Sequence, residues 1–542
     1  MMTRKLKFMY LFMLIIISCY ANFFTDSFRF EPVYSLNILN SDAVQLFPIY
    51  NIYDSTLFKN DLFIKNIRNQ LNVITKIKLF INDGKYLILM HFFPFPLAIK
   101  IVSIILCTFS VFLIYRIGVY LYSKDCAIVL SGLFLFYFLS MDTFYGGQDR
   151  GFGALIFCIF LLLLVKEKLL FLPFLLPLVA FFYQPFLFVL TMICLLVLFF
   201  YKKNIKFKWY ILFLVINILV NIFLIFNDKL LNIMMVNVST LVSYKYHYKN
   251  NVVNPCNPLH ILLYFVFNLN EHSRLHVYFT LFFIALSLVI VVLRRMKVFR
   301  LPKAIWLILL GSVFSFFATY PINPVLASRQ LVFSVPLFLV FFVSTNIFQI
   351  INRHKVNSAI LLLPLISIFV VLHPMFNKIV DFKKYKPVYD YIERLPKDTL
   401  IAGNPSSWIV DKIPFFSKRA IFFADDIDSH LYISYGVEGF WERRKNLMLA
   451  LYVDSLEEVK AFATMYNIDY FVIETYLYND SFFNYLKQSV RPYDRQTWSL
   501  IKNKIDKNSF FLLEFVKKNY DFKLKDKNGY IFIISSKKVI QK

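Results

Sequence analysis

Three polar residues interrupt the apolar runs of this chain in the segment YGGQDRGFG, residues 145–153. Asp149 could bind a divalent cation through its carboxylate oxygens. Arg150 could hold a phosphate through two parallel hydrogen bonds. The two side chains could instead pair with each other and anchor the segment at the membrane surface. Charged groups at membrane depth are costly and usually functional, so we predict a phosphate-binding site here.

Three further residues could complete such a site. Asp42 lies in a polar stretch near the N-terminus and could take a proton from a hydroxyl group as a general base, or act as a turn or cap residue. Arg329 directly precedes an apolar run and could bind phosphate, or its side chain could extend to the membrane surface. Gln184, in YQP (183–185), could contact the ligand or cap its turn. Asp54, in YDST, is typical of a turn.

The composition predicts a protein that crosses the membrane many times. Hydrophobic residues make up 59% of the 542 residues and the mean hydropathy is +0.61, above the 45–50% typical of soluble domains. Apolar runs of membrane-spanning length recur along the first two thirds of the chain. We expect about eleven spans, near 7–23, 97–121, 126–141, 153–165, 169–184, 186–201, 209–226, 273–293, 304–320, 331–350 and 357–374, with 258–269 as a weaker, interfacial segment.

The distribution of basic residues predicts the orientation of these spans. The net charge is +26, and much of the excess lies in short turns between apolar runs, as expected for cytoplasmic turns; we therefore do not expect nucleic-acid binding. The N-terminus is predicted inside and, with an odd number of spans, the C-terminus outside. The first 23 residues resemble a signal peptide, but we favour an uncleaved first helix because many spans follow.

Two lengths predict the depth of the polar segments. Sixteen residues separate Arg150 from the basic turn at Lys166, which is about 24 Å of helix. The hydrocarbon layer is about 30 Å thick, so Asp149 and Arg150 should lie at or below the outer interface. Residues 169–201 must cross and return with only 33 residues, which predicts short helices or a sunken turn at 183–185.

The sequence divides into two predicted domains. Residues 1–374 form the multi-spanning membrane domain, with a long first outer loop at 24–96. Residues 375–542 form a polar, extracytoplasmic α/β domain, in which TLIAG (399–403), RAIFFA (419–424) and GYIFIIS (529–535) read as strands and 455–475 as a helix followed by a strand. The six cysteines form no CxxC pair, so no cysteine metal cluster or disulfide framework is expected.

The layout resembles the GT-C superfamily of integral membrane glycosyltransferases. The resemblance lies in an early acid in the first outer loop (Asp42), STLFKNDLF (55–63), QDRGFG (148–153), multiple spans and an outer C-terminal domain. It is nearest to the bacterial branch related to aminoarabinose transferases and protein O-mannosyltransferases. The chain departs from that branch in two respects. Gln184 stands where a histidine is usual, and Ala43 follows Asp42, so the adjacent acid pair of some members is absent.

The resemblance implies a donor that is a sugar on a polyprenyl phosphate, with transfer at the outer face of the membrane. It implies that Asp42 is the base, that Asp149 helps to hold a divalent cation such as Mg²⁺ or Mn²⁺, and that Arg150 and Arg329 hold the donor phosphate. In a bacterial source the location is the inner membrane. Two alternatives remain open: a transporter or flippase of lipid-linked glycans, which would have polar residues within several spans, and a non-catalytic membrane scaffold whose outer domain binds a partner.

Overall fold

The computed structural model describes two compact units of the chain. Unit 1 comprises Met1–Leu39, Ile77–Val242 and Val252–Asp381, and unit 2 comprises Asn40–Lys76, Ser243–Asn251 and Phe382–Lys542. The described residues are 12, 16, 35–36, 50–51, 54–59, 88–140, 149–183, 185–201, 207–227, 301–319, 324–354, 380–425, 432–453, 455–488, 498–502 and 510–541. Of the expected first outer loop, the described residues 50–51 and 54–59 thus group with the C-terminal residues rather than with the apolar helices.

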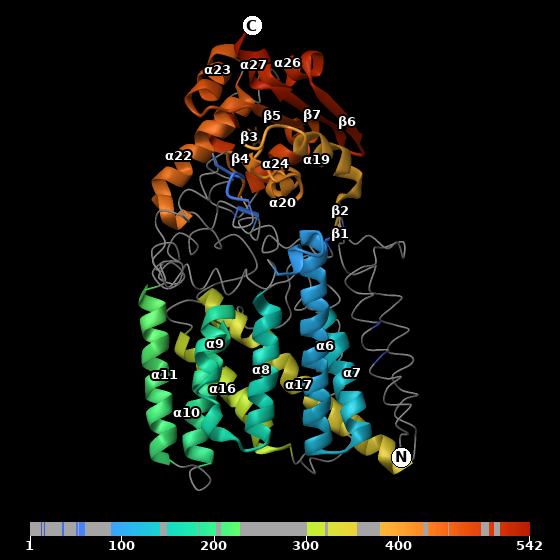
Figure 1. Cartoon of the computed structure of the whole chain (residues 1–542), viewed down its shortest axis with the longest axis vertical. Helices are drawn as coiled ribbons and strands as arrows, with labels where there is room; N and C mark the ends of the chain where they lie inside the picture. Colours follow the sequence, from blue (N-terminus) through green and yellow to red (C-terminus); the bar gives the residue numbers. More distant parts are fainter. Residues whose placement is uncertain are drawn as a thin grey trace. The chain divides into compact units, whose positions relative to one another are not determined.

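The described part of unit 1 consists almost wholly of apolar helices that lie side by side (Figure 1). They are α6 (Phe95–Leu121), α7 (Lys124–Ser140), α8 (Asp149–Val165), α9 (Leu175–Phe182), α10 (Pro185–Phe200), α11 (Phe207–Asn227), α16 (Lys303–Thr319) and α17 (Pro324–His354). A short pair of strands, β1 (Ser35–Leu36) and β2 (Val380–Asp381), joins distant parts of the same unit. The expected spans at 7–23, 273–293 and 357–374 lie outside the described residues, apart from Phe12 and Ile16.

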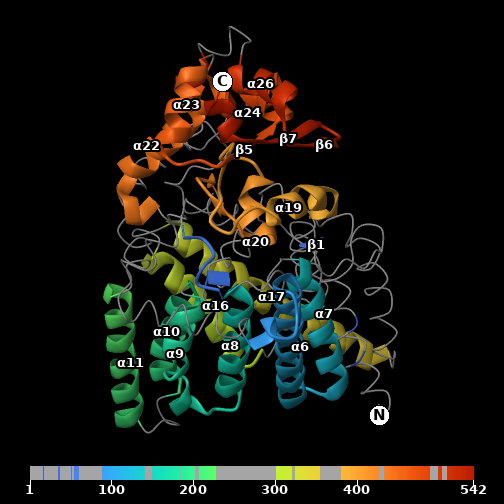
Figure 2. The ribbon, with the colours of Figure 1, turned by 45° about the horizontal axis from the view of Figure 1, so that its top comes forward.

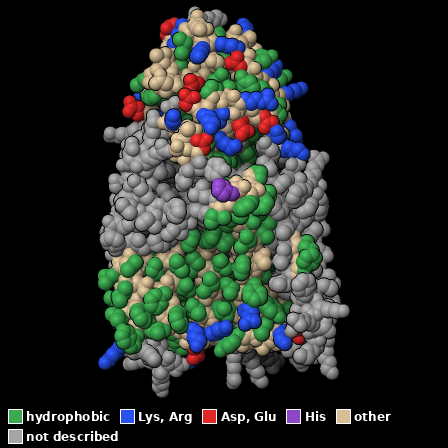
Figure 3. Space-filling view, in the orientation of Figure 1, with side chains coloured by type: hydrophobic (Ala, Val, Ile, Leu, Met, Phe, Trp, Pro, Cys, Tyr) green, Lys and Arg blue, Asp and Glu red, His purple; other side chains and the backbone are tan. Residues whose placement is uncertain are grey.

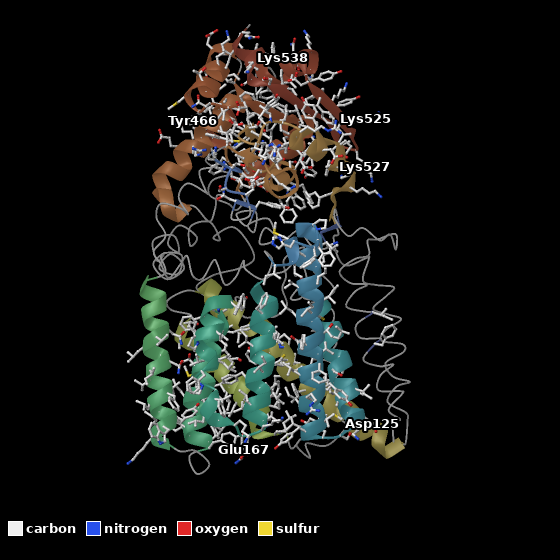
Figure 4. All side chains as sticks on the ribbon, in the orientation of Figure 1. Asp125, Glu167, Tyr466, Lys525, Lys527 and Lys538 are labelled. Carbon is white, nitrogen blue, oxygen red and sulfur yellow. The ribbon has the colours of Figure 1, made fainter. Side chains whose placement is uncertain are left out.

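The face of unit 1 seen in Figure 3 is apolar over the length of the described helices. Large exposed hydrophobic residues occur on most of them, including Phe109, Phe112, Leu178, Phe199 and Trp209. A water-soluble protein rarely exposes so extensive an apolar surface. Among the described residues, Leu97–Leu121 is long and apolar enough to cross a membrane, and five further apolar helices are shorter. Figure 4 places Asp125 and Glu167 at one end of the bundle, where basic side chains also gather.

Proline explains why the expected span at 169–184 is not one helix. The structure has a short 3-10 turn, η1 (Leu169–Phe171), and then the eight-residue helix α9. Pro173 lies between them and has no backbone N–H, so a continuous helix would lose a hydrogen bond there. Pro177 is tolerated because it stands in the first turn of α9. The short helix that the chain length predicted is therefore present.

Unit 2 contains a five-stranded mixed sheet in the order β4-β3-β5-β7-β6 (Figure 1), of which Figure 2 labels β5, β7 and β6. Strand β3 (Leu400–Gly403) pairs in parallel with β4 (Ala420–Ile421) and β5 (Tyr470–Glu474). Strand β7 (Gly529–Ser535) pairs antiparallel with β5 and with β6 (Phe522–Asp526). Strands β3, β4, β5 and β7 match the expected strands. Strand β6 was not predicted, because only Phe522 and Leu524 of its five residues are apolar.

Two groups of helices pack against this sheet. The first group is α19 (Lys386–Glu393) and α20 (Ile413–Ser417), which contact each other and reach β6 and β4 respectively. The second is α22 (Tyr432–Tyr452), α23 (Leu456–Met465), α26 (Phe511–Asn519) and α27 (Ser536–Ile540), which contact one another and reach β3 and β7. Strand β3 is fully buried, as expected for a central parallel strand covered on both faces.

Candidate functional site

Helix α8 begins at Asp149, so Asp149 and Arg150 occupy its first turn rather than a loop. The expected span near 153–165 therefore begins four residues earlier than predicted. An acidic residue is favourable at a helix N-terminus because it faces the positive end of the helix dipole. Gly153 permits close packing of α8 against Tyr183, because a Cβ atom on Gly153 would lie 2.7 Å from the Cβ atom of Tyr183.

A group of aromatic rings joins helices α8, α10 and α17. The ring centroid of Phe157 lies 5.5 Å from that of Phe186 and 5.1 Å from that of Phe333. Phe186 and Phe333 are 5.0 Å apart, and Tyr183 packs edge-on against Phe186 at 4.7 Å. All three phenylalanines are buried or nearly so. Such ring pairs fix the relative positions of the three helices.

The two candidate arginines stand on the helices that this aromatic group joins. Arg150 precedes Gly153 by three residues and Phe157 by seven, a spacing that places the three positions on one face of α8. Arg329 precedes Phe333 by four residues on α17. Each arginine position therefore lies one or two helical turns N-terminal to the shared rings. The side chains of Asp149, Arg150 and Arg329 are outside the described part of the structure.

Buried hydrogen bonds fix the rotation of α17 next to Arg329. Gln330 is fully buried, accepts a hydrogen bond from the Ser315 hydroxyl (2.7 Å) and donates one to the Thr319 hydroxyl (2.9 Å), both on α16. A glutamine with both ends bonded holds its helix in one register, because any rotation would leave buried polar groups unpaired. Helix α17 begins at Pro324, whose fixed backbone angle suits the first position of a helix.

Two of the predicted site residues, Asp42 and Gln184, lie outside the described residues, although Tyr183 and Pro185 on either side of Gln184 are described. Asp54 has the predicted turn role. Its carboxylate accepts hydrogen bonds from the Thr56 N–H (3.0 Å) and hydroxyl (2.6 Å) and from the Lys397 ammonium (2.7 Å). The Lys397 and Thr56 contacts hold the pKa of Asp54 below its ordinary value.

The described residues show no metal centre to support the expected cation. No group of three or more His, Cys, Asp or Glu side chains that could hold a metal occurs within the described ranges. Asp149 alone does not make such a group, so a divalent cation remains a prediction from the resemblance. No chemical step proposed below depends on it.

A second polar cluster, which was not predicted from the sequence, lies where the parallel strands of unit 2 end. The Asp425 carboxylate, just after β4, accepts two hydrogen bonds from the Arg444 guanidinium at 2.8 and 3.0 Å, and both side chains are buried. Asp425 also accepts a hydrogen bond from Ser406, in the loop after β3 (2.9 Å). The only sequence signal was a charged residue directly after an apolar strand, in IFFAD (421–425).

Breaking this buried ion pair should destabilise unit 2 strongly. We expect Arg444→Met to lower the free energy of unfolding by about 3–5 kcal/mol, because Asp425 would remain buried and unpaired. Lys517→Met is the matched control, since it breaks the exposed Lys517–Glu514 pair, worth less than about 1 kcal/mol. Hydrogen exchange of peptides covering β3 and β5 in the full-length protein measures both. Similar protection of β3 and β5 in the two variants would show that the Arg444–Asp425 pair does not stabilise unit 2.

Glu474 ends β5 in the same cluster and is buried. Ser407 donates a hydrogen bond to one carboxylate oxygen, and Tyr476 donates one to the other at 2.5 Å. Burial raises the pKa of Glu474 to about 7, and the two hydrogen bonds only partly offset this effect. In the folded protein Glu474 therefore keeps its proton to a higher pH than it does in the unfolded chain.

The stability of unit 2 should consequently fall as the pH rises from about 4.5 to about 7. In this window the unfolded chain has released the Glu474 proton that the folded state retains, so rising pH favours unfolding, by about 3 kcal/mol in total. Glu474→Gln should match the wild type near pH 4.5 and exceed its stability near pH 8. Thermal unfolding at both pH values tests this, with Glu514→Gln as the exposed control. An equal difference at both pH values would contradict it.

Comparisons with known proteins show the fold of the chain. No family model matches the sequence, and no curated protein matches it. Solved structures of the oligosaccharyltransferase AglB from Archaeoglobus fulgidus do match. The crystal structure of its complex with Zn and sulfate has a TM-score of 0.52 at 10% identity, covering 97% of this chain and 73% of that one. The complex with an inhibitory peptide and a dolichol-phosphate has a TM-score of 0.51 at 9% identity, covering 97% and 74%.

A third AglB structure, tethered to an acceptor peptide that contains the sequence NVT, has a TM-score of 0.51 at 10% identity and covers 98% of this chain and 74% of that one. These likenesses extend over nearly the whole chain and show that its fold is similar to that of this oligosaccharyltransferase. This fold agrees with the predicted superfamily. The likenesses leave the predicted bacterial branch as an expectation from the resemblance alone.

Proposed function

We propose that this protein is an integral membrane glycosyltransferase that moves a sugar from a polyprenyl-phosphate donor to an acceptor at the outer face of the membrane. The observation that carries the proposal is the position of Arg150 and Arg329. Both stand near the N-terminal ends of helices that meet through Phe157 and Phe333, in a chain whose fold is similar to that of an oligosaccharyltransferase. The AglB complex with a dolichol-phosphate is consistent with a lipid-linked donor.

The chemistry of such a donor suits two arginines on helices that are joined by the rings of Phe157, Phe186 and Phe333. The acceptor oxygen attacks the anomeric carbon, the bond from that carbon to the phosphate oxygen breaks, and the phosphate leaves with the electron pair. Negative charge therefore grows on the phosphate in the transition state. Guanidinium groups already in place stabilise that charge, and more strongly where little water is present. The N-terminal ends of two helices favour the same negative charge.

We propose that Asp42 accepts the proton that the acceptor hydroxyl loses. A carboxylate in this role must lie within hydrogen-bonding reach of the hydroxyl. Gln184, beside the packed Tyr183, is proposed to contact the donor through its amide. The lipid tail of the donor stays in the bilayer, so the reaction requires a site at the depth of the lipid headgroups. The proposed topology has about eleven spans, the N-terminus inside and residues 375–542 outside, in the inner membrane if the source is bacterial.

Turnover of the donor tests this proposal without knowledge of the acceptor. Purified protein is incubated with a panel of polyprenyl-phosphate sugars and with membrane extract as a source of acceptors, and released polyprenyl phosphate is measured by mass spectrometry. The proposal predicts release from at least one donor that depends on the protein. An intact donor across the whole panel, with folded protein, would favour the scaffold alternative.

A further inference from the structure

The outward face of the β6–β7 hairpin of unit 2 combines exposed lysines with aromatic rings. Side chains alternate along β6: Phe522, Leu524 and Asp526 are half-buried, whereas Lys523 and Lys525 are exposed. The register places Lys523 opposite Phe532 and Lys525 opposite Tyr530 on β7. Two faces of one strand therefore have different roles, one packed against the domain and one presented to the solvent.

The aromatic rings on the outward face form a continuous row. The ring centroid of Phe532 lies 5.9 Å from that of Tyr530 and 5.5 Å from that of Tyr520. Tyr530 is 36% exposed and Tyr520 is 41% exposed, whereas the Phe532 ring between them is buried. The Lys523 ammonium lies over this row, 4.2 Å from the Tyr530 ring and 5.7 Å from the Tyr520 ring. These cation–π contacts hold the ammonium and the rings together as one surface.

The acidic residues of the hairpin do not neutralise these lysines. Asp526 binds Lys384 (3.5 Å) and accepts a hydrogen bond from Tyr385 (3.1 Å). Asp521 binds Lys538 and accepts a hydrogen bond from the Ser535 N–H (2.5 Å). Across the described ranges, neither Lys523 nor Lys525 has a carboxylate within 4.0 Å. Figure 4 shows Lys525 at the margin of unit 2. Positive charge on this face is thus available to a partner.

The tight turn of the hairpin holds this face in place. Gly529 has a φ of +139°, which side chains other than glycine rarely adopt, and a Cβ atom there would lie 2.1 Å from the Thr475 hydroxyl oxygen. The Tyr530 N–H donates a hydrogen bond to the same hydroxyl (2.9 Å). The hairpin is therefore tied to the segment that follows β5, and the Tyr530 ring projects from a fixed backbone.

We propose that this face, composed of Lys523, Lys525, Tyr520 and Tyr530 around the buried Phe532 ring, binds an anionic saccharide. Its lysines carry positive charge, which is complementary to the negative charge of carboxylate or phosphate groups. Its exposed tyrosines offer flat apolar rings for the C–H faces of sugar units and hydroxyl groups for hydrogen bonds. A flat sheet face suits an extended chain of sugars better than a small ion. The inference names the chemistry of an acceptor, and in that sense it rests on the proposed transfer function.

The simplest competing explanation is that lysines on an edge strand prevent pairing with other sheets. That explanation requires charge on β6 but gives no reason for the two exposed tyrosine rings beside it. Attraction to anionic lipid headgroups is a second explanation, which requires charge but not tyrosine. A contribution of Tyr530 to binding would therefore distinguish a saccharide ligand from the edge-strand explanation and from the lipid explanation.

Binding of defined polyanions to the full-length protein in nanodiscs of zwitterionic lipid tests the inference. The probes are an oligogalacturonate, its methyl ester, inorganic polyphosphate and vesicles containing phosphatidylglycerol. We expect the protein to bind oligogalacturonate and not its uncharged ester at low ionic strength. Lys523→Gln/Lys525→Gln should weaken binding by about tenfold or more, equivalent to about 1.4 kcal/mol. Tyr530→Ala should weaken binding of oligogalacturonate but not of polyphosphate.

The matched control is Lys518→Gln/Lys537→Gln, which removes the same charge from two exposed positions on α26 and α27. An equal loss in that control, no binding of oligogalacturonate, or binding confined to the vesicles would each overturn the inference. Binding is measured without a donor. A protein that binds the saccharide but releases no polyprenyl phosphate would contradict only the transfer proposal. One that consumes donor without binding saccharide would contradict only this inference.

Discussion

Replacing Asp42 by asparagine is expected to lower the rate of donor turnover by about 10²–10⁴-fold, the usual contribution of a general base. Asparagine has the same size and can still accept a hydrogen bond, but it cannot take a proton from the acceptor hydroxyl. Folding and donor binding should be retained, because the substitution changes neither the aromatic rings that join α8, α10 and α17 nor Arg150 and Arg329. The rate of polyprenyl-phosphate release, measured by mass spectrometry at saturating donor, gives the effect.

Asp54→Asn is the control for this substitution. Asp54 follows Asp42 in the same polar stretch of the sequence, but its carboxylate is engaged by Thr56 and Lys397, so it has a turn role. We expect Asp54→Asn to leave turnover within about twofold of the wild type, because an exposed ion pair contributes little. Wild-type turnover in Asp42→Asn would remove Asp42 as the base and would return it to the role of a cap or turn residue.

Replacing Arg150 and Arg329 together by alanine is expected to have the second large effect. Removal of one preplaced hydrogen-bond donor to a developing negative charge commonly lowers the rate by about 10²–10³-fold, and both arginines are proposed to bind the same phosphate. The double variant should lose donor turnover and also lose affinity for the phosphate product. Turnover and product affinity are measured on the same detergent-solubilised preparations.

Two further variants make this prediction sharper. Arg150→Lys/Arg329→Lys keeps the charge but cannot form two parallel hydrogen bonds, so it should recover only part of the activity. Arg116→Ala removes an exposed arginine of α6 outside the proposed site and should leave turnover unchanged. If Arg116→Ala reduced turnover as much as the double variant, general charge rather than a phosphate site would explain the loss.

The helices of unit 1 were largely predictable because each apolar run has to satisfy its own backbone hydrogen bonds within the membrane. The expected runs at 97–121, 126–141 and 209–226 correspond to α6, α7 and α11 with small shifts at their ends. The break at Pro173 and the helical start at Asp149 were not predicted. In both places a local rule, a proline or an acid at a helix N-terminus, outweighed the length of the apolar run.

The candidate site was predictable in residue type but not in arrangement. Arg150 and Arg329 are almost 180 residues apart in the sequence, and nothing in either segment indicates that their helices meet. The contact depends on Phe157, Phe186 and Phe333, which look like any other phenylalanines in apolar runs. In unit 2, nothing in the segment WERRKN (441–446) singles out Arg444, and only the fold shows that it is buried against Asp425.

The most direct measurement of the central claim is the thermal unfolding midpoint of the detergent-solubilised protein with and without a polyprenyl phosphate. A ligand that binds only the native state raises the apparent midpoint. The account predicts a rise for the wild type and for Asp42→Asn, and none for Arg150→Ala/Arg329→Ala. No rise for the wild type across several polyprenyl phosphates would contradict a lipid-phosphate site, and the acid and the two arginines would then be structural anchors at the membrane surface.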